Sequence, residues 1–277
     1  MNTELLLNAI DFYNQGNSMN STCKKFHTTP GTLKKLFQKN NIHIRNQKEQ
    51  LILENKKRAK PINHDFFSTP TQDNCYYLGF LAADGCVRKD RNEIKISLSS
   101  IDKQFLEDMK KNMNSSNEIK TYISNDGFEY CEFRFTSLQI KNDISKYGIV
   151  PNKTKIGISM QSIPLEYKLA FIKGYFDGDG SLVINKNTKQ VKVSFVSHTK
   201  TILEEIKDYF NSGNIYPKNG NYSLEFSTIA SLNILRSFYE LNTPCLQRKH
   251  NKYLDCLKIR NNIPRDKNSS VEDEKIC

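Results

Sequence analysis

Two nine-residue segments of this chain repeat one unusual arrangement. They are YLGFLAADG at residues 77–85 and IKGYFDGDG at residues 172–180. Each is an apolar stretch with small residues that runs into an Asp-Gly step. Because Asp84 and Asp179 lie 95 residues apart, the arrangement marks a duplicated unit. A duplication of this kind predicts a pseudo-two-fold structure with a pair of carboxylates at its axis.

The chain is also strongly basic. Its 277 residues include 41 Lys and Arg against 30 Asp and Glu, which gives a formal net charge of +11. The expected partner is therefore a polyanion. Paired carboxylates in a basic protein indicate metal-assisted phosphodiester chemistry.

Cysteine usage and hydropathy indicate the compartment. The seven cysteines are odd in number and form no CxxC pair, which fits a reducing compartment and no zinc site. No run approaches the roughly 18 apolar residues of a membrane span, and the N-terminus lacks the pattern of a signal peptide. We expect a cytoplasmic protein from a prokaryotic or phage-type setting that is neither secreted nor membrane-bound.

Residues 1–46 are predicted to form a small all-α domain. Glu4–Asn14 and Ser18–Phe26 have the pattern of short helices, and Thr29 can cap a third helix that has Pro30 at its first position. Three short helices joined by tight turns are typical of a helix-turn-helix. The first 60 residues hold eleven Lys and Arg against four Asp and Glu, so most of the net positive charge lies there.

The spacing of Gly16, Phe26, Thr29 and Leu33 resembles the resolvase-like and homeodomain-like helix-turn-helix families. This resemblance implies that part of the third helix faces a DNA groove or its phosphates. A solvated basic helical module is the alternative interpretation. The candidate DNA contacts are Thr28, Thr32, Lys34, Lys35, Lys39 and Arg45.

Residues 47–74 are predicted to be a basic linker. They contain the cluster KKRAKP at residues 56–61 and turn-forming residues at 68–74. The cluster is open to three interpretations: an arm that follows phosphates, which we favour, a nuclear import signal, or a solvated charge run. Residues 261–277 are expected to be a disordered polar tail.

From residue 75 onward the pattern of helices and strands occurs twice. The repeats are predicted at 75–153 and 154–260, each as αββαββα. Six of these eight strands are located by their residue pattern, at 93–99, 117–123, 129–136, 190–196, 213–217 and 222–227. The expected helices are 102–113, 138–147, 200–210 and 229–241. The fold class is thus α+β with antiparallel sheets.

An antiparallel sheet that helices cover on one face leaves its other face free. The residues that alternate outward are polar and partly basic, so this face can lie along nucleic acid. An ordinary solvated face is the alternative for each residue taken alone. The candidate DNA contacts on the two sheets are Lys95, Arg134 and Lys192.

The two repeated segments resemble the signature helices of the LAGLIDADG homing endonucleases, in the single-chain form that carries both copies. The resemblance covers most of residues 75–257, including YGIVPNKT at 147–154. It implies two signature helices packed at the centre of a pseudo-two-fold core with saddle-shaped sheets. It also implies that Asp84 and Asp179 bind Mg²⁺ or Mn²⁺ between the scissile phosphates of two DNA strands.

The glycines of the two motifs carry separate predictions. Gly79 and Gly174 are expected to let the two helices approach closely. Gly85 and Gly180 are expected to adopt the left-handed turn that ends each helix.

The two motifs differ at one acid. The first has Ala82 where the second has Asp177, so only Asp84 and Asp179 are common to both. These two carboxylates are expected near negative helix C-termini and near each other. Such an arrangement raises the cost of two bare charges and favours a bound cation.

The resemblance further implies a catalytic lysine near each site. Lys153 and Lys249 lie at comparable places in the segments that close the two repeats, 96 residues apart. A cation there can steady the pentacovalent phosphate or orient the attacking water. A surface lysine is the alternative for each.

The sequence thus predicts a monomeric, site-specific endonuclease that cuts both strands of a long, nonpalindromic DNA target, as in the homing of mobile introns. Two other classes stay open. One is a transcriptional regulator that binds DNA without cutting it, against which both motif acids argue. The other is an RNA maturase, against which the helix-turn-helix argues more weakly.

Overall fold

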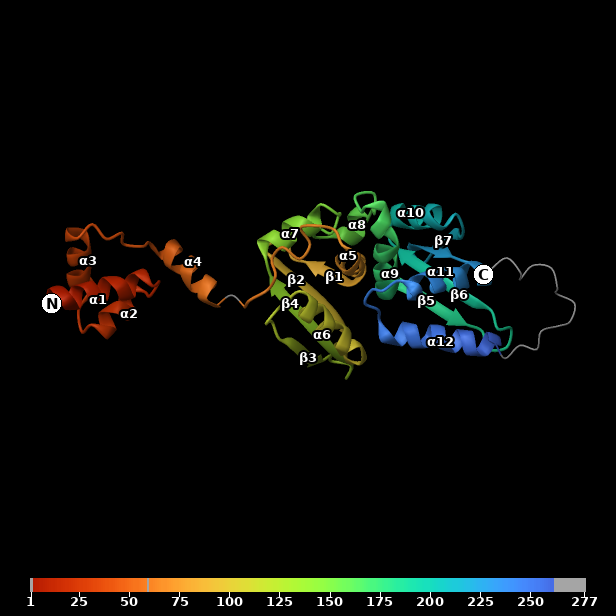
Figure 1. Cartoon of the computed structure of the whole chain (residues 1–277), viewed down its shortest axis with the longest axis horizontal. Helices are drawn as coiled ribbons and strands as arrows, with labels where there is room; N and C mark the ends of the chain where they lie inside the picture. Colours follow the sequence, from red (N-terminus) through yellow and green to blue (C-terminus); the bar gives the residue numbers. More distant parts are fainter. Residues whose placement is uncertain (1, 59, 262–277) are drawn as a thin grey trace, which may run out of the picture. The chain divides into compact units, whose positions relative to one another are not determined.

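The computed structural model describes residues 2–58 and 60–261, which divide into two compact units at residue 60 (Figure 1). Part of the predicted basic arm and residues 262–277 of the predicted tail lie outside the described residues. Within the described part, no helix is long and apolar enough to cross a membrane.

The first unit begins with three helices near the predicted positions: α1 (Thr3–Asn14), α2 (Met19–Lys25) and α3 (Pro30–Lys39). Each starts at a side-chain cap, because Asn2, Ser18 and Thr29 accept hydrogen bonds from backbone N–H groups of the first turn. A small core holds the helices together. Its buried members are Ala9, Tyr13, Cys23, Leu33 and Phe37.

The segment predicted as a linker is more ordered than expected. Helix α4 (Gln47–Arg58) occupies its first part. The helix starts at a reciprocal cap: Asn46 Oδ1 accepts from Glu49 N at 2.9 Å, and Glu49 Oε2 accepts from Asn46 N at 2.7 Å. The spacing of Asn46 and Glu49 is therefore a helix-start signal within the segment that its charge and turn residues predict to be a linker.

The second unit contains two four-stranded antiparallel sheets, in the orders β1-β2-β4-β3 and β5-β6-β8-β7. This confirms the predicted α+β class and its duplication. The strands of the first half are β1 (Gly85–Val87), β2 (Glu93–Ser99), β3 (Ile119–Ile123) and β4 (Glu129–Thr136). Those of the second half are β5 (Gly180–Ile184), β6 (Val191–Ser197), β7 (Asn214–Lys218) and β8 (Asn221–Glu225).

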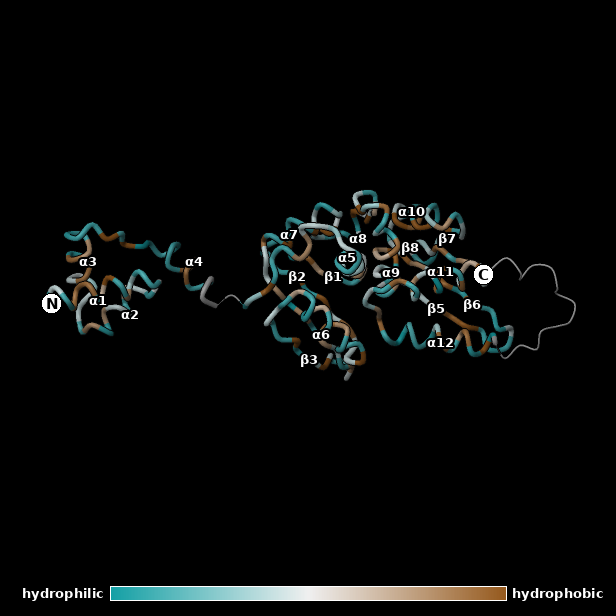
Figure 2. The backbone as a smooth tube through the Cα atoms, in the orientation of Figure 1, coloured by the Kyte–Doolittle hydropathy of each residue, from teal (hydrophilic) through white to brown (hydrophobic). Residues whose placement is uncertain are grey.

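Each half has its own set of helices. The first half has α5 (Gln72–Asp84), α6 (Lys103–Asn112), α7 (Leu138–Ser145) and the short α8 (Lys153–Ile156). The second has α9 (Lys168–Asp179), α10 (Thr201–Phe210), α11 (Thr228–Glu240) and α12 (Gln247–Asn261). Figure 2 shows α12 as mainly hydrophilic, so only part of its surface can face the core.

Strand register places the apolar residues on the helix side. Ile94 pairs with Phe135 and Ile96 with Phe133, and all four side chains are buried. Because side chains alternate along a strand, the charged residues between them lie on the opposite face.

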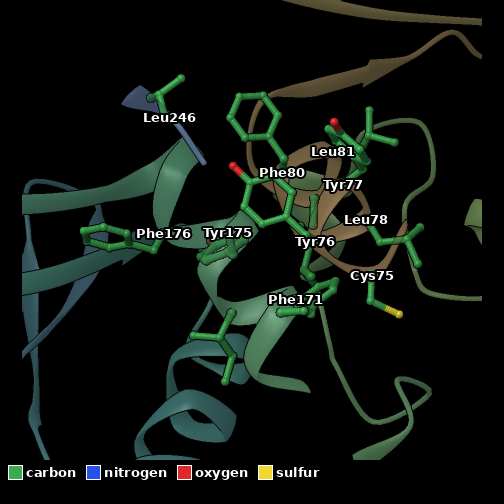
Figure 3. Packing of buried hydrophobic residues seen from close by; sticks show 14 of the residues in the cluster. Cys75, Tyr76, Tyr77, Leu78, Phe80, Leu81, Phe171, Tyr175, Phe176 and Leu246 are labelled. Carbon is green, nitrogen blue, oxygen red and sulfur yellow. The ribbon is translucent and has the colours of Figure 1, made fainter. Parts of the chain in front are cut away.

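Helices α5 and α9 lie side by side between the two halves (Figure 1). A Cβ atom at Gly79 would overlap the carbonyl oxygen of Phe171, and one at Gly174 would overlap that of Tyr76. The helices meet backbone to backbone at these two points, as the motifs predict. Aromatic side chains, including Tyr76 and Phe171, pack around the contact (Figure 3).

The predicted left-handed turn at the end of each motif helix is wrong. Gly85 has φ −70° and Gly180 has φ −84°, both extended, because β1 and β5 start directly at these residues. Glycine is needed for space instead. A Cβ would lie 2.6 Å from the Leu81 carbonyl oxygen in the first case and 2.8 Å from Phe176 Cα in the second.

Candidate active site

The two motif carboxylates come together at the C-terminal ends of α5 and α9. Asp84 Oδ2 lies only 3.2 Å from the position that a Cβ on Gly178 would take, so this carboxylate rests against the last turn of the facing helix. Asp179 is the next residue of that turn. Water reaches both acids, which are exposed on the protein surface.

The surrounding protein disfavours two negative charges at this point. Although both residues are open to water on one side, partial burial and then the neighbouring Asp84 raise the pKa of Asp179 to about 6. Partial burial also raises the pKa of Asp84, while Lys249 and Lys153 act to lower it. Two carboxylates that resist joint ionisation are stabilised by a cation between them.

Lys153 and Lys249 both reach the ends of the motif helices. Buried Lys153 donates from Nζ to the Ala83 carbonyl oxygen at 2.8 Å. Lys249, also buried, donates to the carbonyl oxygens of Asp177 at 2.9 Å and Gly180 at 2.6 Å, and to that of Phe176. Burial lowers the pKa of Lys153, and it lowers that of Lys249 to about 8.

The acid that distinguishes the second motif has a structural place. Asp177 is buried and accepts hydrogen bonds from Tyr76 Oη at 2.6 Å and Leu246 N at 2.9 Å. Leu246 directly precedes α12, so this contact fixes the start of the helix that carries Lys249. With Ala82 at the corresponding position, the first half has no such link.

A further contact joins the two halves. Arg248 Nε donates to Asp102 Oδ2 at 2.8 Å, which ties the start of α12 to the turn before α6. The residues are 146 positions apart, and nothing in the local sequence of either indicates the pairing.

The basic candidates on the sheet faces are paired with acids. Glu132 Oε2 lies 3.1 Å from Lys95 Nζ, and Glu132 Oε1 lies 2.6 Å from Arg134 Nη2. Lys192 forms an ion pair with Glu225. The alternation of residues located these cations on the outer face, but the acids beside them leave it less positive than the cations alone suggest.

The candidate DNA contacts of the first unit differ in whether their side chains are exposed or occupied by internal contacts. Four of them are exposed on α3, and Thr28 is partly exposed just before it. The exposed four are Thr32, Lys34, Lys35 and Lys39. Arg45 instead donates to the carbonyl oxygens of Tyr13 at 2.8 Å and Asn17 at 2.6 Å, and it stacks on the Tyr13 ring. The Arg45 side chain is therefore occupied by contacts within the unit. A DNA contact would require it to be free, so the structure does not favour Arg45 in that role.

The carboxylate oxygens of Asp84 and Asp179 are suitable ligands for a hard divalent cation, which prefers oxygen ligands. Among the described residues, no group of three or more His, Cys, Asp and Glu side chains could hold a metal ion. Asp84 and Asp179 would therefore share the cation with water or with phosphate oxygens of a bound nucleic acid.

Family comparisons agree with this geometry. A family model described as LAGLIDADG endonuclease matches residues 172–260, and one described as LAGLIDADG-like domain matches residues 73–131. Each range includes the C-terminal part of one of the two paired helices, with its terminal acid. The chain belongs to the LAGLIDADG endonuclease family, whose members use divalent metals.

The fold is similar to that of solved LAGLIDADG proteins. The meganuclease I-AabMI bound to uncleaved DNA is 18% identical, with a TM-score of 0.50 over 68% of this chain and 90% of that one. A mutant of I-SmaMI is 14% identical, with a TM-score of 0.51 over 69% of this chain and 92% of the other. At these identities the likeness concerns the fold.

Two proteins of Methanocaldococcus jannaschii are similar in sequence. The uncharacterized protein MJ0314 is 28% identical over 170 residues, which is 57% of each chain. The DNA-directed RNA polymerase subunit Rpo1C is 26% identical over 167 residues, 60% of this chain and 18% of that protein. The chain thus spans just over half of the first relative and less than a fifth of the second.

Proposed function

We propose that this protein is a site-specific endonuclease that hydrolyses both strands of duplex DNA. The observation that supports this best is the convergence of Asp84, Asp179, Lys153 and Lys249 at the C-terminal ends of two paired helices. The meganuclease I-AabMI, which has a similar fold, was solved bound to uncleaved DNA. This makes duplex DNA the favoured polyanion for the basic chain.

The proposed chemistry divides among these residues. Asp84 and Asp179 would hold Mg²⁺ or Mn²⁺. When bound, the metal would supply Lewis acidity that favours attack by water on the phosphate and stabilises the leaving oxygen. Lys153 and Lys249 hold the ends of the two motif helices, and their positive charge offsets the extra negative charge on the phosphate in the transition state. Asp177 is a positioning residue for Lys249 through the start of α12.

The two halves differ on the sheet faces that we assign to DNA, which favours a nonpalindromic target for a monomer. Glu132 lies close to both Lys95 and Arg134 in the first half, whereas Lys192 pairs with Glu225 in the second. We assign the exposed cations of α3 to additional DNA outside the cut site, which lengthens the target.

The direct test is cleavage of DNA by the full chain. The substrate is the genomic sequence that flanks the gene, labelled on both strands, with Mg²⁺ or with EDTA. We expect paired cuts at one position in Mg²⁺ only. Tight binding without any nick would favour the non-cleaving regulator, and preferential binding of structured intron RNA would favour the maturase.

Substituting the exposed lysines of α3 should weaken DNA binding in a salt-dependent way. The triple variant Lys34→Gln, Lys35→Gln and Lys39→Gln keeps the cap and core of the unit. The slope of log K against log salt is negative, and each lost phosphate contact should reduce its magnitude by about 0.9. For the triple variant we expect the slope to become less steep by up to about 3. An unchanged slope in a salt titration would remove α3 from the DNA-binding surface.

Lys153→Met should slow cleavage of one strand more than the other, because each lysine contacts the C-terminal end of a different motif helix. Single-turnover rates measured separately for each strand would show a nicked intermediate. Lys155→Met is the matched control, since Lys155 is exposed on the same short helix. Equal slowing of both strands, or a loss of affinity that explains the whole decrease, would contradict the role of Lys153.

A further inference from the structure

In the first half, the segment at residues 61–71 fills a groove between helices. Asn63 N donates to the Met113 carbonyl oxygen at 2.9 Å, at the end of α6. His64 Nδ1 lies 2.8 Å from Ser137 Oγ, at the start of α7. These two contacts tie the N-terminal part of the segment to the end of α6 and to the start of α7.

Further contacts hold the same segment along α5 and α7. Ser68 Oγ donates to Asp143 Oδ2 at 2.7 Å. Asn74 Nδ2 donates to the Phe66 carbonyl oxygen at 3.0 Å. Phe67 is 1% exposed, so the groove buries a large aromatic side chain.

The duplication gives each of these contact points a counterpart in the second half. Helices α6 and α10 end alike, each followed by an asparagine in the left-handed region, Asn114 at φ 47° and Asn211 at φ 46°. The residues before them are Met113 and Phe210, which therefore correspond. Ser227 caps α11 as Ser137 caps α7.

Two more correspondences follow from equal spacing. Asn233 lies six residues after the cap of α11, as Asp143 does after the cap of α7. Leu169 and Asn74 each lie ten residues before the terminal acid of their motif. Every contact point of the first groove thus has an equivalent residue.

All four equivalents line one cavity of about 610 Å³ in the second half. The segment before α9 follows a different route. Ser159 Oγ and Met160 N both donate to the Glu205 carboxylate on α10, at 2.6 Å each. The groove that residues 61–71 fill in the first half is therefore open in the second.

The lining of the cavity indicates what can bind there. None of the described residues that form it is Asp, Glu, Lys or Arg, and Asn233 replaces the charged Asp143. Tyr209, Phe210 and Ile229 provide apolar surface, and Ser227 provides a polar contact. A phosphate backbone would find no cation in this lining, whereas a neutral apolar polypeptide matches it.

We propose that this cavity is a docking groove for a segment of a partner protein. The bound segment carries aromatic and aliphatic side chains and takes the place that residues 61–71 take in the first half. Its aromatic side chains pack on Phe210 and Ile229, and a polar side chain bonds to Ser227. The groove would attach a second protein without involving the carboxylate pair.

The probe is a fluorescent peptide with the sequence of residues 60–71, titrated with the full chain and followed by anisotropy. We expect saturable binding that Ile229→Arg weakens at least tenfold. Ile229 is 73% exposed, so the substitution blocks the groove without disturbing the core. Ile101→Arg is the matched control, because Ile101 is 82% exposed in the first half, and it should leave binding unchanged.

Several results would overturn the proposal. No saturable binding up to about 1 mM would show that the cavity does not take such a segment. Equal effects of the two arginine variants would place binding elsewhere. If the wild-type chain sediments as a dimer and the Ile229→Arg variant sediments as a monomer, the occupant of the groove is a second copy of the chain. Tighter peptide binding by a chain ending at residue 261 would make the chain's own C-terminal residues the occupant.

Discussion

Asp179→Asn and Asp84→Asn should each abolish cleavage of both DNA strands while leaving DNA affinity nearly unchanged. Asparagine keeps the shape of aspartate but lacks the charge that holds a divalent cation. We expect the cleavage rate to fall at least about 10³-fold, a loss of about 4 kcal/mol of transition-state stabilisation. Single-turnover cleavage and gel-shift binding in Ca²⁺ measure the two quantities.

The fold should tolerate these changes, because both acids are exposed and removing one relieves their mutual repulsion. Asp208→Asn is the matched control, since Asp208 is an exposed acid in the last turn of α10. It should cut at the wild-type rate. If either motif variant still cuts both strands at that rate in Mg²⁺, the carboxylate pair is not the metal site.

Gly174→Ala should destabilise the second unit strongly, as Gly79→Ala should, because both glycines lie where the two motif helices touch. The added Cβ would overlap the Tyr76 carbonyl oxygen and lie 2.9 Å from Phe80 N. Both are backbone atoms of the facing helix, so the clash is relieved only if α5 and α9 separate. We expect a loss of at least about 4 kcal/mol, measured as the free energy of unfolding in urea.

Gly31→Ala provides the matched control for this prediction. Gly31 is the second residue of α3, and a Cβ there meets nothing within 4 Å. Alanine should therefore be neutral or stabilise the first unit by up to about 1 kcal/mol. A Gly174→Ala protein within about 1 kcal/mol of wild type would show that the helices pack less closely than the structure indicates.

The sequence by itself determined the architecture, because hydrophobic periodicity and capping are local signals. The alternation over residues 93–99 and 129–136 predicted β2 and β4 residue by residue, and Thr29-Pro30 predicted the start of α3. The duplicated Asp-Gly motif located the helix pair and the acids at its ends. Each alternation, cap or motif copy lies within one helix or one strand.

Tertiary structure decided which side chains meet. Arg248 pairs with Asp102 across 146 residues, and Lys153 reaches Ala83 across 70. Glu132 neutralises two cations of a sheet face that the sequence predicts as polar and partly basic, and Gly85 is required for space rather than for a left-handed turn. These contacts depend on the distance between elements far apart in the chain. Local propensity carries no information on that distance, because packing of the whole core sets it.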